Sequence, residues 1–231
     1  MNILLLDAST SAEIISVKKD DGLFDLSEIS SISHSKTLFT RMDLCLKKAA
    51  ITMKDIKLIA VGIGPGSFTG IRIAVSTARM LAQVLGIRIV QMSSQLIFAQ
   101  SMDSEEGDFV LPAFDAKKGR VFGALYVKKN SILEEVIPPG DYYINQLLEK
   151  IPQGVKTNCA GDGCEKFSDI IKNTSNEIII TANFLPSGIH SLEYLTDLYN
   201  KGELDDLKYD KIVPDYTRKS DAEIAMDLKK V

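Results

Sequence analysis

The pattern of hydrophobic and polar residues is most distinctive between residues 58 and 86. An apolar run over residues 58–63 predicts a buried strand, which ends at the turn Gly64-Pro65-Gly66. A helix is expected after this turn, with Ser67 or Thr69 as its cap, and it should end near Gly86. Its apolar residues lie on most sides, so either the rest of the chain or a second protein must cover it. Four small residues recur in it at a spacing of four, which would let another backbone approach closely: Gly70, Ala74, Ala78 and Ala82.

The two halves of the chain repeat one order of predicted elements. Residues 3–7 predict a buried strand that ends in Asp7, followed by a polar turn and two further strands. Residues 109–115 form another apolar run that ends in Asp115, and again a polar turn and two strands follow. The repeat indicates a duplicated domain. The polar segment 104–108 separates the halves, so we expect one unit over residues 1–104 and a second, with an extended tail, over residues 105–231.

The elements between these landmarks follow from hydrophobic periodicity. The second group of strands is expected to end at Pro138-Pro139-Gly140. The other predicted elements are helices over 33–50, 93–102, 142–150, 163–172, 186–201 and 221–230, and strands over 87–91, 156–161 and 177–181.

Composition narrows the class of protein. The chain has 231 residues, of which 45% are hydrophobic and 25% charged, which is typical of a globular protein. Its net charge of −4 provides no overall basic field for nucleic acid. The three cysteines, Cys45, Cys159 and Cys164, have no spacing of a disulfide scaffold and favour a reducing compartment. Because neither a signal peptide nor a membrane-length apolar run is found, we expect a cytoplasmic protein with no membrane contact.

The glycine-rich turn at residues 64–70 matches neither common nucleotide motif. A P-loop requires a lysine that is missing here, and the third glycine of a dinucleotide-binding loop is replaced by Ser67 or Thr69. Two interpretations stay open. The turn could be needed only for packing, or it could hold an anion at the N-terminus of the helix that follows.

The strand-end carboxylates of Asp7 and Asp115 also have two interpretations. Acidic groups at the carboxyl ends of strands can face a cleft and hold Mg²⁺ through water. Alternatively, each caps its own turn. Asp162, between two glycines, is expected to be a turn residue.

Metal chemistry and hydrolysis by a histidine-based set are both disfavoured. The chain has two histidines, His34 and His190, and Leu38 stands where an HxxxH pair would need a second histidine. Arg72, Arg79 and Arg88 lie in or just after the apolar helix, either at its rim or as contacts to a partner or an anion.

The segment from Gly64 to Arg72, GPGSFTGIR, resembles the corresponding loop of the TsaB (YeaZ) family, bacterial proteins of tRNA threonylcarbamoyladenosine biosynthesis. Other segments that resemble the family are residues 7–10, His34-Ser35, residues 115–122, 161–163 and 214–218. The resemblance implies an α/β fold of two actin-like lobes, of the ribonuclease-H-like or ASKHA type. The repeat that ends in Asp7 and Asp115 agrees with it.

The resemblance also implies a role. The chain would be a non-catalytic partner of TsaD, which transfers threonylcarbamoyl to N6 of adenosine 37 in tRNAs reading codons that begin with A. It would pair with TsaD in a heterodimer, form a homodimer when alone, join TsaE in a larger complex, and meet tRNA only through that complex. No catalytic residue, metal or intrinsic cofactor is implied, beyond weak ATP or ADP with Mg²⁺ at an interface.

Two sets of site residues follow from the resemblance. The implied partner-binding residues are His34, Leu38, Phe39, Met42, Cys45, Gly70, Ile71, Ala74, Val75, Ala78, Arg79 and Ala82. The implied vestigial nucleotide cleft consists of Asp7, Ser9, Thr10, Asp115, Gly161, Asp162 and Gly163.

Three other functions compete with this interpretation. An active phosphotransferase or ATPase would use Asp7 and Asp115 to hold Mg-ATP, although the first turn lacks a glycine for close approach to phosphate. A metallopeptidase would need the missing histidine pair. Direct tRNA binding by this chain alone is opposed by the net charge of −4.

Overall fold

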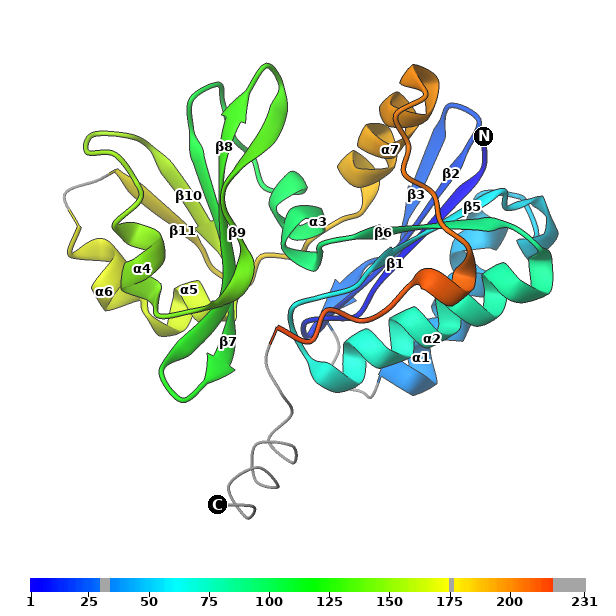
Figure 1. Ribbon diagram of the computed structural model, residues 1–231, viewed down its shortest axis with the longest axis horizontal. Helices are drawn as coiled ribbons and strands as arrows, with labels where there is room; N and C mark the ends of the chain where they lie inside the picture. Colours follow the sequence, from blue (N-terminus) through cyan, green and yellow to red (C-terminus); the bar gives the residue numbers. More distant parts are fainter. Residues whose placement is uncertain (30–33, 175–176, 218–231) are drawn as a thin grey trace, which may run out of the picture.

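A computed structural model of the chain describes residues 1–29, 34–174 and 177–217, excluding the side chains of residues 34–36. The described residues form two lobes side by side, each built on one mixed sheet (Figure 1). The strand that ends in Asp7 and the strand that carries Asp115 occupy comparable central places in the two sheets. No helix among the described residues is both long and apolar enough to cross a membrane.

The first lobe has a sheet in the order β3-β2-β1-β5-β6, with β4 also pairing with β2. β1 pairs with β2 in antiparallel and with β5 in parallel orientation, and β5 pairs in parallel with β6. Every residue of β1 and β5 is buried, as expected of central strands covered on both faces. The strands are β1 (Ile3–Asp7), β2 (Ala12–Lys19), β3 (Gly22–Asp25), β4 (Glu28–Ile29), β5 (Leu58–Gly62) and β6 (Arg88–Met92).

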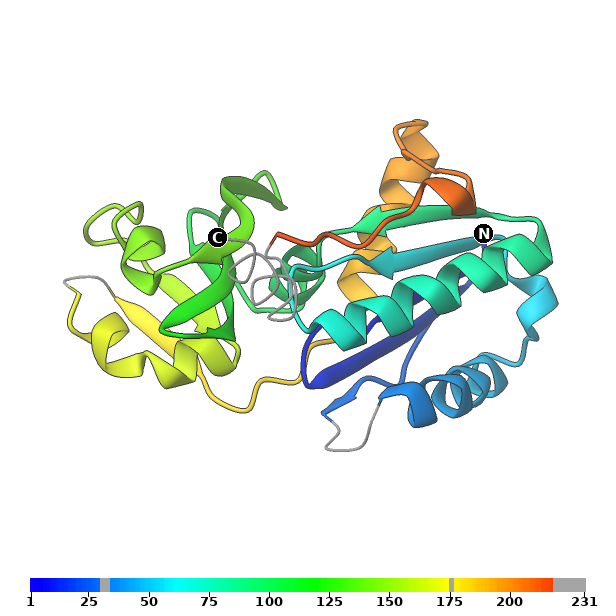
Figure 2. The same ribbon diagram turned by 60° about the horizontal axis from the view of Figure 1, so that its bottom comes forward.

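Two pairs of helices cover this sheet, one pair on each face (Figures 1 and 2). α1 (His34–Lys48) and α2 (Phe68–Leu85) pack on the face that carries Leu4 and Leu6. α3 (Ser94–Gln100) and α7 (Ile189–Lys201) lie on the face that carries Ile3 and Leu5. A short 3-10 helix, η1 (Met53–Asp55), connects α1 to β5.

The second lobe has a sheet in the order β11-β10-β7-β8-β9. Three short helices cover one of its faces, and the other face packs against α3 through the aromatic residues Phe98, Phe114 and Tyr126. The elements are β7 (Phe109–Lys117), β8 (Arg120–Lys129), β9 (Ile132–Tyr142), α4 (Ile144–Leu148), β10 (Thr157–Ala160), α5 (Asp162–Lys166), α6 (Ser168–Lys172) and β11 (Ile178–Thr181).

After β11 the chain returns to the first lobe. α7 contacts β2 and β3, Leu207 forms an antiparallel bridge with Ile89, and η2 (Tyr209–Lys211) contacts α2. The sequence pattern places residues 105–231 in one second unit, whereas residues 189–215 pack on the first lobe. The physical reason is that Leu192, Leu195 and Ile212 bury their side chains in the two cores of the first sheet. The helix predicted over residues 221–230 lies outside the described residues.

The strand, turn and helix predicted over residues 58–86 are confirmed. β5 and α2 begin and end within about one residue of the expected positions. Ser67 caps the helix, because its side-chain oxygen accepts a hydrogen bond from the Gly70 N–H at 3.3 Å. Gly86 ends the helix in the left-handed conformation, with φ of 66°.

Candidate functional site

Most of the residues implied in partner binding are buried by this chain itself. The following residues of α1 and α2 are buried on the side that faces the first sheet: Leu38, Met42, Cys45, Gly70, Ile71, Ala74, Val75, Ala78 and Ala82. They face Leu4, Leu6, Ile15 and Val17 of β1 and β2. Of the two possibilities that the sequence left open, the chain itself covers these residues, and the implied partner-binding assignment is corrected to core residues. The side chain of His34 lies outside the described residues.

The row of small residues in α2 also serves contacts within the chain. A Cβ atom added at Gly70 would lie 1.8 Å from the carbonyl oxygen of Ala8, far closer than atoms can approach. Gly70 therefore lets the first turn of α2 approach the turn after β1. Ala74, Ala78 and Ala82 are fully buried, so the row does not face outward and is not a surface for another backbone.

Burial also determines the chemistry of Cys45 on α1. Its side chain is fully buried, and burial raises the pKa of the Cys45 thiol to about 11. Because the thiolate is the reactive form, this cysteine is an inert core residue.

The outward side of the same two helices carries other residues, although the buried Leu38 also borders the groove on this side. A groove of about 360 Å³ runs between α1 and α2, lined by Leu38, Phe39, Arg72, Ile73, Ser76 and Thr77. Of the implied partner-binding residues, Phe39 is 48% exposed in this groove and Arg79 is half-buried at the edge of α2. Met80 and Val84 continue the apolar face along α2 and are 45% and 78% exposed. We call the surface formed by Phe39, Ile73, Ser76, Met80 and Val84 the α1–α2 face.

Sequence reasoning missed Ile73, Met80 and Val84 as part of this face. A usable signal was present, because these three residues recur at helical spacing on the side of α2 opposite the small residues. Since both sides of the helix are apolar, the pattern alone did not indicate which side packs inward.

The C-terminal segment borders the α1–α2 face. The guanidinium carbon of Arg72 lies 3.7 Å from the centre of the Phe68 ring, and its Nε donates a hydrogen bond of 2.9 Å to the hydroxyl of Tyr216. The rings of Phe68 and Tyr216 have their centroids 5.0 Å apart. The Asp215 N–H donates to the carbonyl oxygen of Ile63 at 2.8 Å, which ties the segment to the glycine-rich turn. Arg72 thus joins the beginning of α2 to the last described residues.

The carboxylate of Asp7 is engaged in contacts within the first lobe. Its Oδ1 accepts hydrogen bonds from the backbone N–H and the hydroxyl of Ser9, at 2.8 and 2.7 Å. Its Oδ2 accepts a short hydrogen bond from the hydroxyl of Ser94, which itself accepts one from the Gly64 N–H at 3.0 Å. Asp7 is 1% exposed. These contacts favour the interpretation that Asp7 caps its own turn.

The glycine-rich turn packs tightly against the same region. The Ser67 N–H donates to the carbonyl oxygen of Ser9 at 2.6 Å, and a Cβ atom at Gly66 would lie 2.4 Å from that oxygen. A Cβ atom at Gly62 would lie 1.6 Å from Oδ2 of Asp7. Because the N–H groups of Gly64 and Ser67 already have acceptors in the protein, the packing interpretation of this turn is favoured over anion binding.

Asp115 is held by two lysines. Its carboxylate oxygens lie 2.8 Å from Nζ of Lys117 and 2.8 Å from Nζ of Lys166. Burial alone would raise the pKa of Asp115, but the hydrogen bonds from both lysines and from the Lys117 backbone lower it to about 2. The Asp115 N–H donates to Asp162 at 2.9 Å. Both aspartates are thus turn-stabilising residues of the second lobe.

The interlobe cleft brings together part of the implied nucleotide site. Thr10 of the first lobe and Gly161 and Asp162 of the second lobe line a space of about 150 Å³. Asp7, Ser9, Asp115 and Gly163 are not among its lining residues. Three aromatic side chains fill the gap, with Phe98 at centroid distances of 4.9 Å from Phe114 and 5.2 Å from Phe184.

The filled cleft is small for a nucleotide. Pockets that bind ligands of that size have volumes of roughly 300–1,000 Å³. The described part of the chain also contains no group of three or more His, Cys, Asp or Glu side chains that could hold a metal ion. Binding of Mg-ATP here would require the lobes to separate and the phenylalanines to move.

Comparisons with known proteins agree with the resemblance at residues 64–72. A family model described as TsaD, tRNA N6-adenosine threonylcarbamoyltransferase, matches residues 26–226. A TsaB protein of Bacillus subtilis is 31% identical over 154 residues, which cover 66% of this chain and 67% of the relative. A TsaB protein of Buchnera aphidicola subsp. Baizongia pistaciae is 28% identical over 228 residues, covering 93% of this chain and 96% of the relative.

A solved structure shows the same arrangement of lobes. YeaZ from Pseudomonas aeruginosa superimposes with a TM-score of 0.79 at 22% sequence identity, covering 93% of this chain and 99% of that structure. The likeness confirms the predicted α/β fold of two actin-like lobes. From the matched family model and the similarity to curated relatives, the chain belongs to the TsaB (YeaZ) family of tRNA threonylcarbamoyladenosine biosynthesis proteins.

Proposed function

We propose that this chain is a non-catalytic partner and activator of a TsaD protein. TsaD would transfer the threonylcarbamoyl group to N6 of adenosine 37, and this chain would hold it in an active state. Membership of the TsaB family supports a role in this pathway. The observation that carries the partner role is the α1–α2 face, where Phe39, Met80 and Val84 expose apolar side chains on two rigidly packed helices.

The α1–α2 face has the properties that a protein interface requires. It combines exposed apolar side chains with polar groups, namely Ser76 within the face and Arg72 at its edge. Its two helices pack on the core of the first lobe, so little conformational entropy of the helices would be lost on binding. The same face would pair two copies of this chain when TsaD is absent. TsaE and tRNA would join through the complex with TsaD, in the cytoplasm.

The inner cleft supports the non-catalytic part of the proposal. Its aspartates are bound by neighbouring hydroxyl, backbone and lysine groups, and its space of about 150 Å³ is lined by Phe98, Phe114 and Phe184. Any ATP or ADP with Mg²⁺ would then bind weakly and at a subunit interface. Calorimetry with Mg-ATP tests this: micromolar binding by the isolated chain would favour the alternative function of an ASKHA-type phosphotransferase or ATPase.

A pair of charge substitutions tests the partner role. Met80→Glu places a carboxylate on the α1–α2 face, whereas Val136→Glu places one at a residue of similar exposure, 41% against 45%, on the second lobe. We expect Met80→Glu to abolish co-purification with TsaD and dimer formation in size-exclusion chromatography with light scattering. The Val136→Glu control should behave as the unaltered protein. Retention of both associations in Met80→Glu would refute the proposed face.

A further inference from the structure

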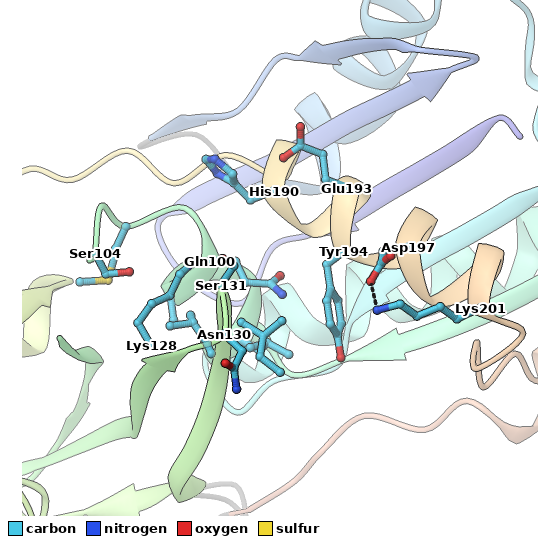
Figure 3. A pocket seen from close by; sticks show the side chains of 15 residues that line it. Gln100, Ser104, Lys128, Asn130, Ser131, His190, Glu193, Tyr194, Asp197 and Lys201 are labelled. Carbon is cyan, nitrogen blue, oxygen red and sulfur yellow. Dashed lines mark ion pairs between the residues drawn. The ribbon is translucent and has the colours of Figure 1, made fainter. Parts of the chain in front are cut away.

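A second cleft between the lobes lies across α3 from the phenylalanine-filled one. Phe98 of α3 lines the filled cleft, whereas Leu96 and Gln100, on the other side of α3, line the second. Its volume is about 400 Å³, within the range of small-molecule sites. Its walls are the β8–β9 hairpin of the second lobe and α7 of the first lobe (Figure 3). We call it the hairpin–α7 cleft.

Lys128 is the charged residue of the hairpin wall of this cleft. The residue lies on the same face of β8 as the buried Tyr126, two residues earlier, and is itself half-buried. Among the described residues its ammonium group has no hydrogen-bond or ion-pair partner. The neighbouring Lys129, on the other face of β8, is instead paired with Glu134 at 2.9 Å. An ammonium group in a partly desolvated cleft without a counter-charge is a group that an anionic ligand would stabilise.

The remaining cleft residues offer hydrogen bonds and apolar contact. In Figure 3, the amide of Gln100 lies between Lys128 on the hairpin and Tyr194 on α7. Gln100 uses its Oε1 to accept a hydrogen bond from Ser191 at 2.6 Å, which orients its amide. Leu96 and Leu133 add apolar surface to the walls. The combination fits a small ligand with a charged end and an apolar body.

The position of the hairpin is fixed from outside the cleft. The backbone N–H groups of Asn130 and Ser131, both with positive φ, donate to the two carboxylate oxygens of Glu106, at 2.8 and 3.5 Å. These N–H groups are therefore not available to a phosphate in the cleft. The hairpin wall is thereby tied to the segment that connects α3 to β7.

We propose that the hairpin–α7 cleft binds a small organic monocarboxylate, with Lys128 as the partner of its carboxylate. Lys201 is already paired with Asp197 at 2.7 Å, and the Glu193 carboxylate on the α7 wall points away from Lys128 in Figure 3. Lys128 therefore offers one unpaired ammonium group, which balances the single charge of a carboxylate but only one of the two charges of a phosphate dianion. A bound carboxylate would contact both lobes and hold them in one relative orientation.

Ligand-observed NMR with paired probes tests the proposal. The probes are benzoate, 4-hydroxybenzoate, 3-phenylpropionate and hexanoate, each beside its neutral primary amide, with inorganic phosphate as the dianion. For probes of about ten heavy atoms, a dissociation constant of about 1 mM is expected for the best carboxylate. Its amide should bind roughly tenfold more weakly, because the bond to a charged partner is lost.

Matched variants locate the binding. Lys128→Met should weaken carboxylate binding roughly tenfold, whereas Lys129→Met, one residue further along the hairpin, should leave it unchanged. Ile132→Trp, at a residue that is 48% exposed and lines the cleft, should block binding by filling the space. Circular dichroism and thermal melting check that each variant folds. The proposal is overturned if none of the four carboxylates binds, if amides or phosphate bind as well, or if Lys128→Met binds as the unaltered chain does.

Discussion

Because α2 packs with one side on the sheet, a substitution by glutamate should have opposite effects on its inner and outer sides. Ala78, on the inner side, is fully buried against the first sheet, whereas Val84, on the outer side, is 78% exposed. We expect Ala78→Glu to prevent folding of the first lobe, and Val84→Glu to leave folding intact while weakening association with TsaD. The same substitution of an apolar residue by glutamate thus separates packing within the chain from packing against a partner.

The magnitudes follow from burial. At Ala78 a glutamate side chain would overpack the core at a cost of about 1–3 kcal/mol, and its buried charge would add several kcal/mol. Their sum is comparable to the total stability of a typical domain, about 5–15 kcal/mol. At Val84 the side chain points into solvent, so the free energy of unfolding should change by less than about 0.5 kcal/mol.

Urea denaturation followed by circular dichroism measures both variants, and co-purification with TsaD measures association of the folded one. If Ala78→Glu unfolded at the same urea concentration as the unaltered protein, the inner side of α2 could not be packed on the sheet. If Val84→Glu lost several kcal/mol of stability, the outer side would be part of a core. Either result would contradict the assignment of the two sides.

Two further predictions concern the contact of Gly70 with Ala8 and the ion pairs of Asp115. Gly70→Ala should destabilise the chain by about 3 kcal/mol, because its Cβ would lie 1.8 Å from the Ala8 carbonyl oxygen, while Ser76→Ala on the exposed side should have little effect in urea denaturation. Asp115→Asn should cost about 1 kcal/mol at pH 7, a value reduced for the solvent exposure of Lys117. Since the folded-state pKa of Asp115 is about 2 against an ordinary value of 3.8, this stabilisation is complete above about pH 5. The difference between Asp115→Asn and the unaltered chain in a urea series should shrink as pH falls from 5 to 2, and a difference independent of pH would refute the ion-pair assignment.

Local sequence patterns predicted the helices and strands well where the local preference agrees with the packing of the folded chain. The strand, turn and helix over residues 58–86 follow from an apolar run, a glycine-rich break and a serine cap, all of which are local. The sheet prediction at Pro138-Pro139-Gly140 was wrong, because β9 continues through these residues to Tyr142. β9 is an edge strand, and proline is tolerated there since one side of the strand needs no ladder hydrogen bonds.

The partner-binding residues show where local pattern stops being informative. In an amphipathic helix the buried side can be predicted because it is apolar and the opposite side is polar. This prediction fails for α2, which is apolar on both sides. The close approach of Gly70 to Ala8 fixes which side packs inward. These residues are 62 positions apart, so the contact cannot be predicted from the local sequence. The return of residues 189–215 to the first lobe is non-local in the same way.

The phenylalanine-filled cleft and the exposed α1–α2 face both suit a partner subunit better than a two-lobed enzyme. An enzyme with two lobes needs them to open and close around its substrate, and aromatic contacts of Phe98 with Phe114 and Phe184 across the gap oppose such motion. A partner subunit instead benefits from rigidity, because a preorganised surface loses less conformational entropy on binding. In this chain, close packing is found at both places, among the phenylalanines of the cleft and in the core beneath α1 and α2. Under the proposed function, the phenylalanine contacts would hold the two lobes together, and the separate core beneath α1 and α2 would hold the α1–α2 face ready for a partner.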